Sequence, residues 1–111
     1  MSPPCLWSLR PVDIASLTFQ ELRPGVEIHV LHESADGARV ALLRYTPGAQ
    51  VPQHRHEGHE YVYVLEGEQS DERGSYSAGS LVVNEPGVTH RVTSERGCVV
   101  LIIWQRPVVF V

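Results

Sequence analysis

The stretch of sequence that decides the fold runs from Gly48 to Gly67 and reads GAQVPQHRHEGHEYVYVLEG. His54 and His56 are two residues apart, so on an extended strand their imidazoles project to the same side. Glu60 keeps the same parity, so all three side chains converge if the intervening chain stays extended or makes a tight bulge. Imidazoles and a carboxylate suit zinc, iron, manganese, nickel or cobalt rather than calcium. The pattern therefore predicts a divalent-metal site.

A fourth metal ligand must come from another part of the chain, and His90 is the candidate. It follows Pro86-Gly87-Val88-Thr89, a turn able to aim it inward from a neighbouring strand. The alternative is that these histidines lie in a polar surface loop, the usual place for a lone histidine. Because H-x-H-x3-E stands between glycines and PGVTH follows downstream, metal binding is the stronger interpretation.

Outside this stretch the chain reads as short β-runs separated by Gly and Pro. Alternating residues predict a strand at 26–30, and Ala35-Asp36-Gly37 offers a turn into a returning strand at 38–46. Further strands are predicted at 60–65 (ending at Gly67), 80–84 and 98–104. No long amphipathic helix is indicated. Many short strands with frequent turns predict an all-β barrel or sandwich.

A length of 111 residues indicates one domain. We expect residues 1–24 to form an N-terminal arm with a short strand or helical turn, 25–105 the barrel, and 106–111 a tail packing on the barrel or a partner. Two runs, Tyr61–Leu65 and Val99–Trp104, are apolar on both faces, so the outer face of each needs cover. A partner subunit is the economical source of that cover, and we expect a homodimer.

Charge and composition argue against several classes of partner. The formal net charge is −4, lysine is absent, and the nine arginines are not concentrated in any stretch. We therefore expect neither nucleic-acid nor membrane binding. The first residues do not resemble a signal peptide and no segment approaches the length of a membrane span, so a cytoplasmic location is expected. Cys5 and Cys98 do not make a disulfide framework, in keeping with a reducing compartment.

The stretch quoted first resembles cupin motif 1, G-x5-H-x-H-x3-E-x6-G, with every fixed position matched. A later stretch, residues 79–94, resembles cupin motif 2, G-x5-P-x-G-x2-H-x3-N. Glu85 stands where that motif has proline and Ser94 where it has asparagine, but neither departure removes a proposed ligand. The two motifs and the segment between them cover under half of the chain. The resemblance implies a single small cupin (jelly-roll) β-barrel with a metal held by His54, His56, Glu60 and His90.

A narrower resemblance covers residues 39–80, which are similar to the cupin domain of ChrR-type anti-sigma factors and their stand-alone relatives. In the anti-sigma factors this domain binds zinc and follows a separate helical zinc domain that binds the sigma factor. Nothing in this sequence resembles that helical domain, so sigma-factor inhibition is not expected of this chain. Acetylacetone-cleaving and related dioxygenases are similar to the same cupin branch, and they use iron.

Two functions are compatible with this ligand set. In the first, three histidines and Glu60 fill four positions of an octahedral metal, and iron with O2 cleaves a β-dicarbonyl or hydroxyketone-type substrate, with Glu60 as ligand or base. In the second, zinc takes four protein ligands in a closed tetrahedron and the barrel is a regulatory or structural module. A third possibility, isomerisation of a sugar or small acid in a cupin pocket, is supported by the fold alone. One divalent metal per chain is expected, zinc or iron first and manganese or nickel next.

Other residues receive less specific predictions. His59 has odd parity and is expected to point away from the metal or to hydrogen-bond near the mouth of the site. Arg44 is either a solvent-facing side chain, the safer interpretation, or an interior group for an anionic substrate. Cys98 is expected to be a small buried hydrophobe, and residues 71–74 a charged hairpin tip. Core or interface packing is expected for the aromatic residues Tyr61, Tyr63 and Trp104.

Overall fold

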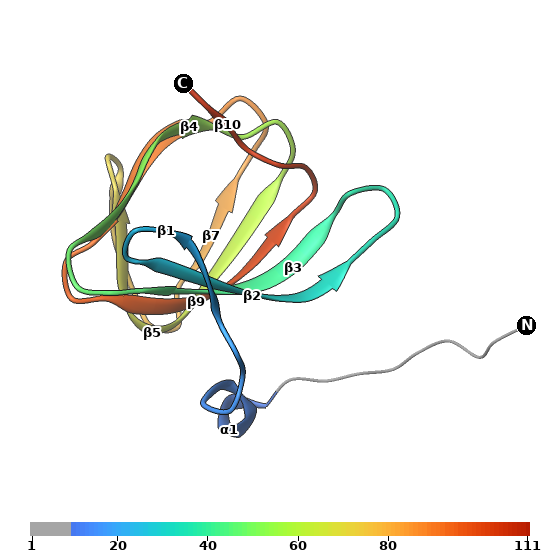
Figure 1. Ribbon diagram of the computed structural model, residues 1–111. Helices are drawn as coiled ribbons and strands as arrows, with labels where there is room; N and C mark the ends of the chain where they lie inside the picture. Colours follow the sequence, from blue (N-terminus) through green and yellow to red (C-terminus); the bar gives the residue numbers. More distant parts are fainter. Residues whose placement is uncertain (1–9) are drawn as a thin grey trace, which may run out of the picture.

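The computed structural model describes residues 10–111, which form a β-barrel preceded by one short helix, α1 (Pro11–Ile14) (Figure 1). The all-β class predicted from the sequence is confirmed. No helix in the described part of the chain is long and apolar enough to cross a membrane. The strands are β1 (Gln20–Arg23), β2 (Val26–Glu33), β3 (Arg39–Tyr45), β4 (Ala49–Arg55), β5 (Glu60–Asp71), β6 (Gly74–Ser77), β7 (Leu81–Asn84), β8 (Thr89–Ser94), β9 (Cys98–Trp104) and β10 (Val109–Phe110).

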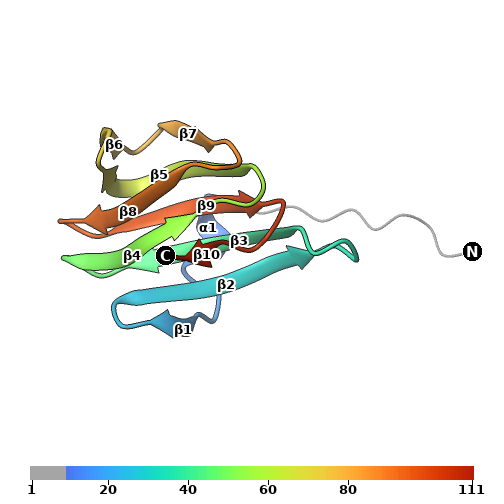
Figure 2. The same cartoon turned by 90° about the horizontal axis from the view of Figure 1, so that it is seen from above.

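The strands follow one hydrogen-bonded path, β1-β2-β3-β9-β5-β8-β4-β10, with β6 and β7 paired to β5 beside it. Every recorded strand pair is antiparallel. The path curls round, so that β4 lies across the interior from β2, β3 and β9, and the view from above shows β1 on one side and β6 and β7 on the other (Figures 1 and 2). Strand β5 belongs to both walls, because its first part pairs with β9 and β7 and its last part with β6 and β8.

The long strand β5 corrects one predicted boundary. We expected the strand that begins at Glu60 to end at Gly67, but it continues to Asp71. Its pairing with β9 shifts register between Val64 and Glu66, and Gly67 follows with a φ of +73°. A side chain at Gly67 would clash with the Gly97 carbonyl, so glycine allows the strand to kink and pass from one wall to the other.

Inward-facing residues of the strands form one apolar core, as alternation in the sequence predicts. On β3, for example, Ala41, Leu43 and Tyr45 face this core. Arg44 lies between the last two of these and faces outward, where it forms an ion pair with Glu27 at 3.0 Å. The solvent-facing interpretation of Arg44 is therefore confirmed and the interior alternative is wrong. The core residues include Val26, Ile28, Val62, Val64, Val92, Val100 and Ile102.

Candidate metal centre

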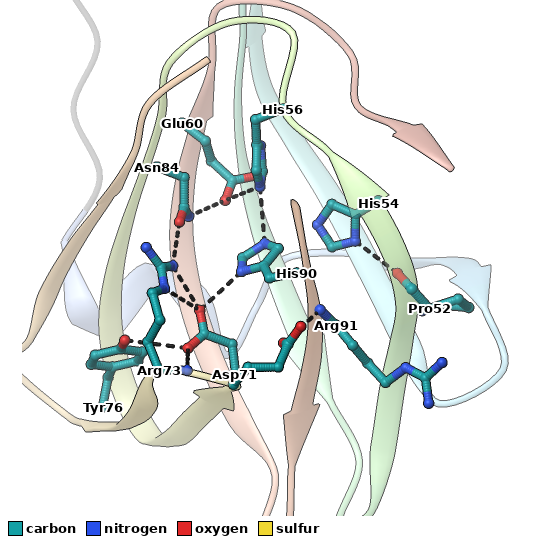
Figure 3. Close-up of polar contacts among 11 residues, drawn as sticks. Pro52, His54, His56, Glu60, Asp71, Arg73, Tyr76, Asn84, His90 and Arg91 are labelled. Atoms are coloured by element: carbon teal, nitrogen blue, oxygen red, sulfur yellow. Dashed lines mark hydrogen bonds and ion pairs between the residues drawn. The ribbon is translucent and has the colours of Figure 1, made fainter. Parts of the chain in front are cut away.

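Two neighbouring strands bring the three histidines of the sequence motifs together inside the barrel. His54 on β4 is the register partner of His90 on β8, and His56 follows just after β4. The backbone N–H of His56 donates to the carbonyl of Val88 at 2.9 Å, which fixes the chain where it leaves the strand. All three side chains are buried, and one nitrogen from each lies within 4.8 Å of the others (Figure 3).

The outer nitrogens of two of these rings are held by acceptors. His54 Nδ1 is 2.8 Å from the Pro52 carbonyl, and His90 Nδ1 is 2.9 Å from Asp71 Oδ2. Because a carbonyl oxygen and an ionised carboxylate accept only, both Nδ1 atoms carry the proton and both Nε2 atoms keep a lone pair. A carboxylate or carbonyl behind a histidine is the usual support of a metal-binding imidazole.

The donor set fits a divalent metal. His56 Nε2 and His90 Nε2 lie 2.9 Å apart, a contact that needs a proton or a cation between two lone pairs. Two nitrogen ligands at about a right angle, each about 2.1 Å from a metal, are separated by about 3 Å. Burial, aided by the neighbouring histidines, lowers the pKa of His56 to about 4. Burial also lowers the pKa of His54. Both rings are therefore neutral at neutral pH, which is the form that binds metals.

Glu60 lies beside the cluster with both carboxylate oxygens occupied. Its Oε2 accepts a hydrogen bond from Trp104 Nε1 at 2.5 Å and its Oε1 accepts one from Asn84 Nδ2 at 3.0 Å. Oε1 is also 3.6 Å from His56 Nε2. Burial raises the pKa of Glu60 to about 7 despite these two donors. The structure thus gathers three of the four predicted ligands into one group and holds Glu60 at its margin.

A chain of hydrogen bonds connects Glu60 to His90 behind the cluster. Asn84, which donates to Glu60, accepts from Arg73 Nη2 at 2.5 Å, and the same Arg73 nitrogen lies 2.7 Å from Asp71 Oδ2 (Figure 3). Burial raises the pKa of Asp71, but its hydrogen bonds with Arg73 and His90 outweigh this and hold it at about 2. Asp71 is therefore an ionised, buried acceptor that orients His90.

Asp71 and Asn84 are parts of the site that the sequence did not predict. The charged residues 71–74 indicate a hairpin tip, and a turn does join β5 to β6 there, but the Asp71 side chain is only 3% exposed. Asn84 alternates with the inward-facing Val82 on β7, and this parity could have identified it. No similar signal marks Asp71, because the kink before Gly67 changes which residues of β5 face inward.

Three further predictions are confirmed. His59 lies outside the cluster, and its Nδ1 donates to Gln105 Oε1 at 3.1 Å. Cys98 is buried in the apolar core, whereas Cys5 falls outside the described residues. Trp104 packs against the core and its Nε1 donates a hydrogen bond to Glu60, so the same indole ring contacts both the apolar core and the carboxylate beside the histidines.

A cavity of about 330 Å³ adjoins the histidine cluster. His54, Glu60 and Trp104 contribute to its wall on the side of the cluster, and most of the remaining wall is apolar. Volumes of this size are typical of small-molecule sites. The arrangement can therefore expose a bound metal to a small ligand inside the barrel.

Comparisons with known proteins agree with this architecture. Residues 9–108 match the family described as the ChrR Cupin-like domain. Over 77 residues the chain is 35% identical to the anti-sigma-E factor ChrR of Cereibacter sphaeroides, an alignment that covers 67% of this chain and 36% of that protein. The crystal structure of Rhodobacter sphaeroides SigE in complex with the anti-sigma ChrR matches with a TM-score of 0.75 and 28% identity, covering 82% of this chain and 51% of that one. The chain thus spans about half or less of the ChrR chains it matches.

A second solved structure resembles this chain over its whole length. The putative acetylacetone dioxygenase from Methylibium petroleiphilum PM1 matches with a TM-score of 0.83, covering 100% of this chain and 85% of that one. Its identity is 14%, so this likeness concerns the fold alone. Together with the ChrR structure it confirms the predicted cupin barrel.

Proposed function

The chain belongs to the ChrR cupin-like domain family, and from that premise we propose that it is a divalent-metal-binding cupin whose ion acts on a small molecule in the adjoining cavity. One observation carries this proposal: three buried histidines have nitrogens within 4.8 Å of one another, and one of them, His54, lines a cavity of about 330 Å³. A purely structural metal site has all its positions filled by protein and needs no such space beside it.

We assign His54, His56 and His90 as metal ligands and Glu60 as the fourth, for one ion per chain. Zinc and iron suit this donor set best, and manganese or nickel also fit it. Asp71 keeps His90 in the tautomer whose Nε2 faces the site. Glu60 either exchanges its hydrogen bond from Asn84 or Trp104 for the metal, or keeps both and accepts a proton from the substrate at a carboxylate oxygen.

A metal-dependent dioxygenase acting on a β-dicarbonyl or hydroxyketone is the enzymatic form of this proposal. When bound, the ion supplies Lewis-acid chemistry and, if it is iron, redox chemistry with O2. The protein's own contribution is a mostly apolar cavity wall with room for a small substrate beside His54 and Glu60. The likeness in fold to an acetylacetone dioxygenase is compatible with this assignment.

A zinc-holding regulatory module is the second candidate. The 35% identity to a protein named as an anti-sigma-E factor favours it, as does the ChrR structure solved in complex with SigE. In this alternative the ion stabilises the barrel and a protein partner reads its presence. The cavity beside the histidines favours the first candidate, because a regulatory zinc with four protein ligands leaves no position for a small molecule.

Metal analysis separates the two candidates. The untagged protein is expressed in medium supplemented separately with iron, manganese or zinc, and its metal content is measured by mass spectrometry. About one iron or manganese per chain, followed by O2 consumption with diketones, supports the enzyme. Zinc retained against excess iron supports the regulatory module, although zinc uptake is the less diagnostic result because zinc lies above iron in the usual affinity order. Absence of metal from every preparation contradicts both.

We further propose that the protein forms a homodimer through the outer face of β5, β7 and β9. Tyr63, Leu81, Val83 and Ile103 are paired neighbours or lie on adjacent strands of this face, and they are between 37% and 62% exposed. Contiguous exposed apolar side chains are typical of subunit interfaces. Light scattering should give the dimer mass for the wild type and the monomer mass for Ile103→Glu. A monomeric wild type at high concentration contradicts the proposal.

A further inference from the structure

Arg23, at the end of β1, lies in the wall of the cavity beside the histidine cluster. Its guanidinium carbon is 4.7 Å from the centre of the Phe110 ring, and the same ring is 5.9 Å from the ring of His54. The ring of Phe110 therefore lies between the Arg23 guanidinium and His54, a proposed metal ligand.

Arg23 has no carboxylate partner among residues 10–111. Arg39, the other arginine of the cavity wall, has Glu33 as its carboxylate partner, with Nε 2.8 Å from Oε1 but not in hydrogen-bond geometry. Four further arginines of the described chain also have carboxylate partners: Arg10, Arg44, Arg55 and Arg73. A partly buried cation that faces a cavity without a counter-ion is poorly solvated, and a bound anion would restore the missing interaction.

The rest of the wall selects among anions. Ile28, Leu43, Val51, Val92 and Ile102 line the cavity and offer an apolar surface. One unpaired guanidinium matches a single negative charge, and its planar fork matches a carboxylate in two parallel hydrogen bonds.

We propose that the cavity binds a small organic monocarboxylate, with its anionic group on Arg23 and its apolar part against β2, β3, β4, β8 and β9. The proposal rests on the proposed function in one respect, that the ligand lies beside the metal. Strands β1 and β10 are the two ends of the strand path, and the contact between Arg23 and Phe110 bridges them. Arg23 thus stands where the barrel is closed by side chains rather than by backbone hydrogen bonds.

The test measures carboxylate binding by isothermal titration calorimetry. The ligands are butanoate, hexanoate and octanoate, each compared with its neutral amide, and the protein is measured after zinc loading and after chelator treatment. The variants are Arg23→Met, Arg23→Lys and the control Arg96→Met, which removes a positive charge from an exposed turn. Metal content and circular dichroism are recorded for every sample.

We expect wild type to bind at least one of these carboxylates about tenfold or more tightly than its amide, since hydrogen bonds to charged groups are strong. Arg23→Met should lose this preference, Arg23→Lys should keep part of it, and Arg96→Met should keep all of it. Metal content should be unchanged throughout.

Several results would overturn the proposal. One is wild-type carboxylate affinity in a folded Arg23→Met protein. Another is affinity that disappears with the metal but not with Arg23, which would place the carboxylate on the ion. A third is the absence of any preference for carboxylate over amide in the wild type, a comparison that holds even if Arg23→Met fails to fold. A preference that depends on Arg23 in protein that never takes up metal would support the carboxylate site while contradicting the proposed function.

Discussion

The histidine cluster and the apolar core occupy the same barrel and the same strands but have different energetics. Strand β8 carries both His90 and Val92 on its inward face, and β4 carries both Val51 and His54. Each fully buried valine stabilises the fold by about 1.5–3 kcal/mol. The buried imidazoles and carboxylate lose hydration instead, and the lowered pKa of His56 and the raised pKa of Glu60 record that loss. The core therefore stabilises the barrel without help, whereas the cluster acquires its full set of partners only with a ligand.

The largest expected effect comes from removing one histidine of the cluster. His90→Ala should abolish stoichiometric metal binding, because it removes a proposed ligand together with the contact between the Nε2 atoms of His56 and His90. In the wild type, a metal at about a thousand times its dissociation constant should add about 4 kcal/mol to the free energy of unfolding. That gain, measured as a shift in Tm by calorimetry, should vanish in the variant, while the Tm of the metal-free protein changes little.

His59→Ala is the matched control for this experiment. His59 is three residues from His56 in sequence but bonds to Gln105 outside the cluster. It should keep both full metal content and the metal-dependent rise in Tm. Full occupancy and unchanged affinity in His90→Ala would show that His90 is not a ligand.

The two regions also differ in how far the sequence predicts them. The core follows from alternation in strands such as the one predicted at 26–30 and from runs that are apolar on both faces, and the predicted strand at 98–104 matches β9 residue for residue. The histidines were identified because their spacing is unusual, and pairing across β4 and β8 then brings His54 opposite His90. Local patterns were sufficient for both, since each depends on neighbours within one or two strands.

The rest of the site depends on irregularities that alternation does not reveal. The pairing of β4 with β8 shifts register between Val51 and His54, so inward positions change from odd to even numbers along β4. The shift in β5 has the opposite effect and turns Gln69 and Asp71 inward after Val64. A strictly periodic strand would expose Asp71. Arg23 was missed for a related reason, because its place in the cavity depends on a short edge strand that closes the barrel.

Cys98, a buried thiol of the core, reports on how closed the core is, and its slow alkylation is the second-largest expected effect. Burial raises the pKa of Cys98 to about 11 from a usual value of 9.0. At neutral pH this lowers the thiolate fraction about a hundredfold, and only the thiolate reacts with alkylating agents. In a Cys5→Ser protein, which has no other thiol, iodoacetamide should react with Cys98 at least a hundredfold more slowly than with the unfolded chain. The rate should still be rising above pH 9, and rapid labelling of the folded protein would show that this part of the core is open.

A tenfold to hundredfold loss of metal affinity is expected from Asp71→Asn. The change keeps the shape of the side chain but removes the charge that accepts from His90 and Arg73. Loss of a carboxylate that hydrogen-bonds to a metal-binding histidine typically lowers metal affinity about tenfold to hundredfold. Glu72→Gln is the control, because it removes a charge from the same turn, and the Glu72 carboxylate accepts a hydrogen bond from the Arg91 backbone rather than from a histidine. Competition with a chromophoric chelator gives both affinities, and equal values would show that Asp71 does not orient His90.

The smallest effect on metal affinity is expected from a substitution in the apolar core. This substitution tests whether the core and the histidine cluster contribute independently. Val64 is fully buried, and Val64→Ala should lower the free energy of unfolding by about 2–3 kcal/mol through lost burial and a residual cavity. Urea unfolding should give the same loss with and without metal, and metal affinity should stay within about twofold of wild type. Val30→Ala removes the same atoms from an exposed side chain of β2, outside the proposed dimer face, and should cost less than about 0.5 kcal/mol. A marked loss of metal affinity in Val64→Ala would mean that the core sets the positions of the ligands, and that the cluster cannot be treated as an independent site on a stable barrel.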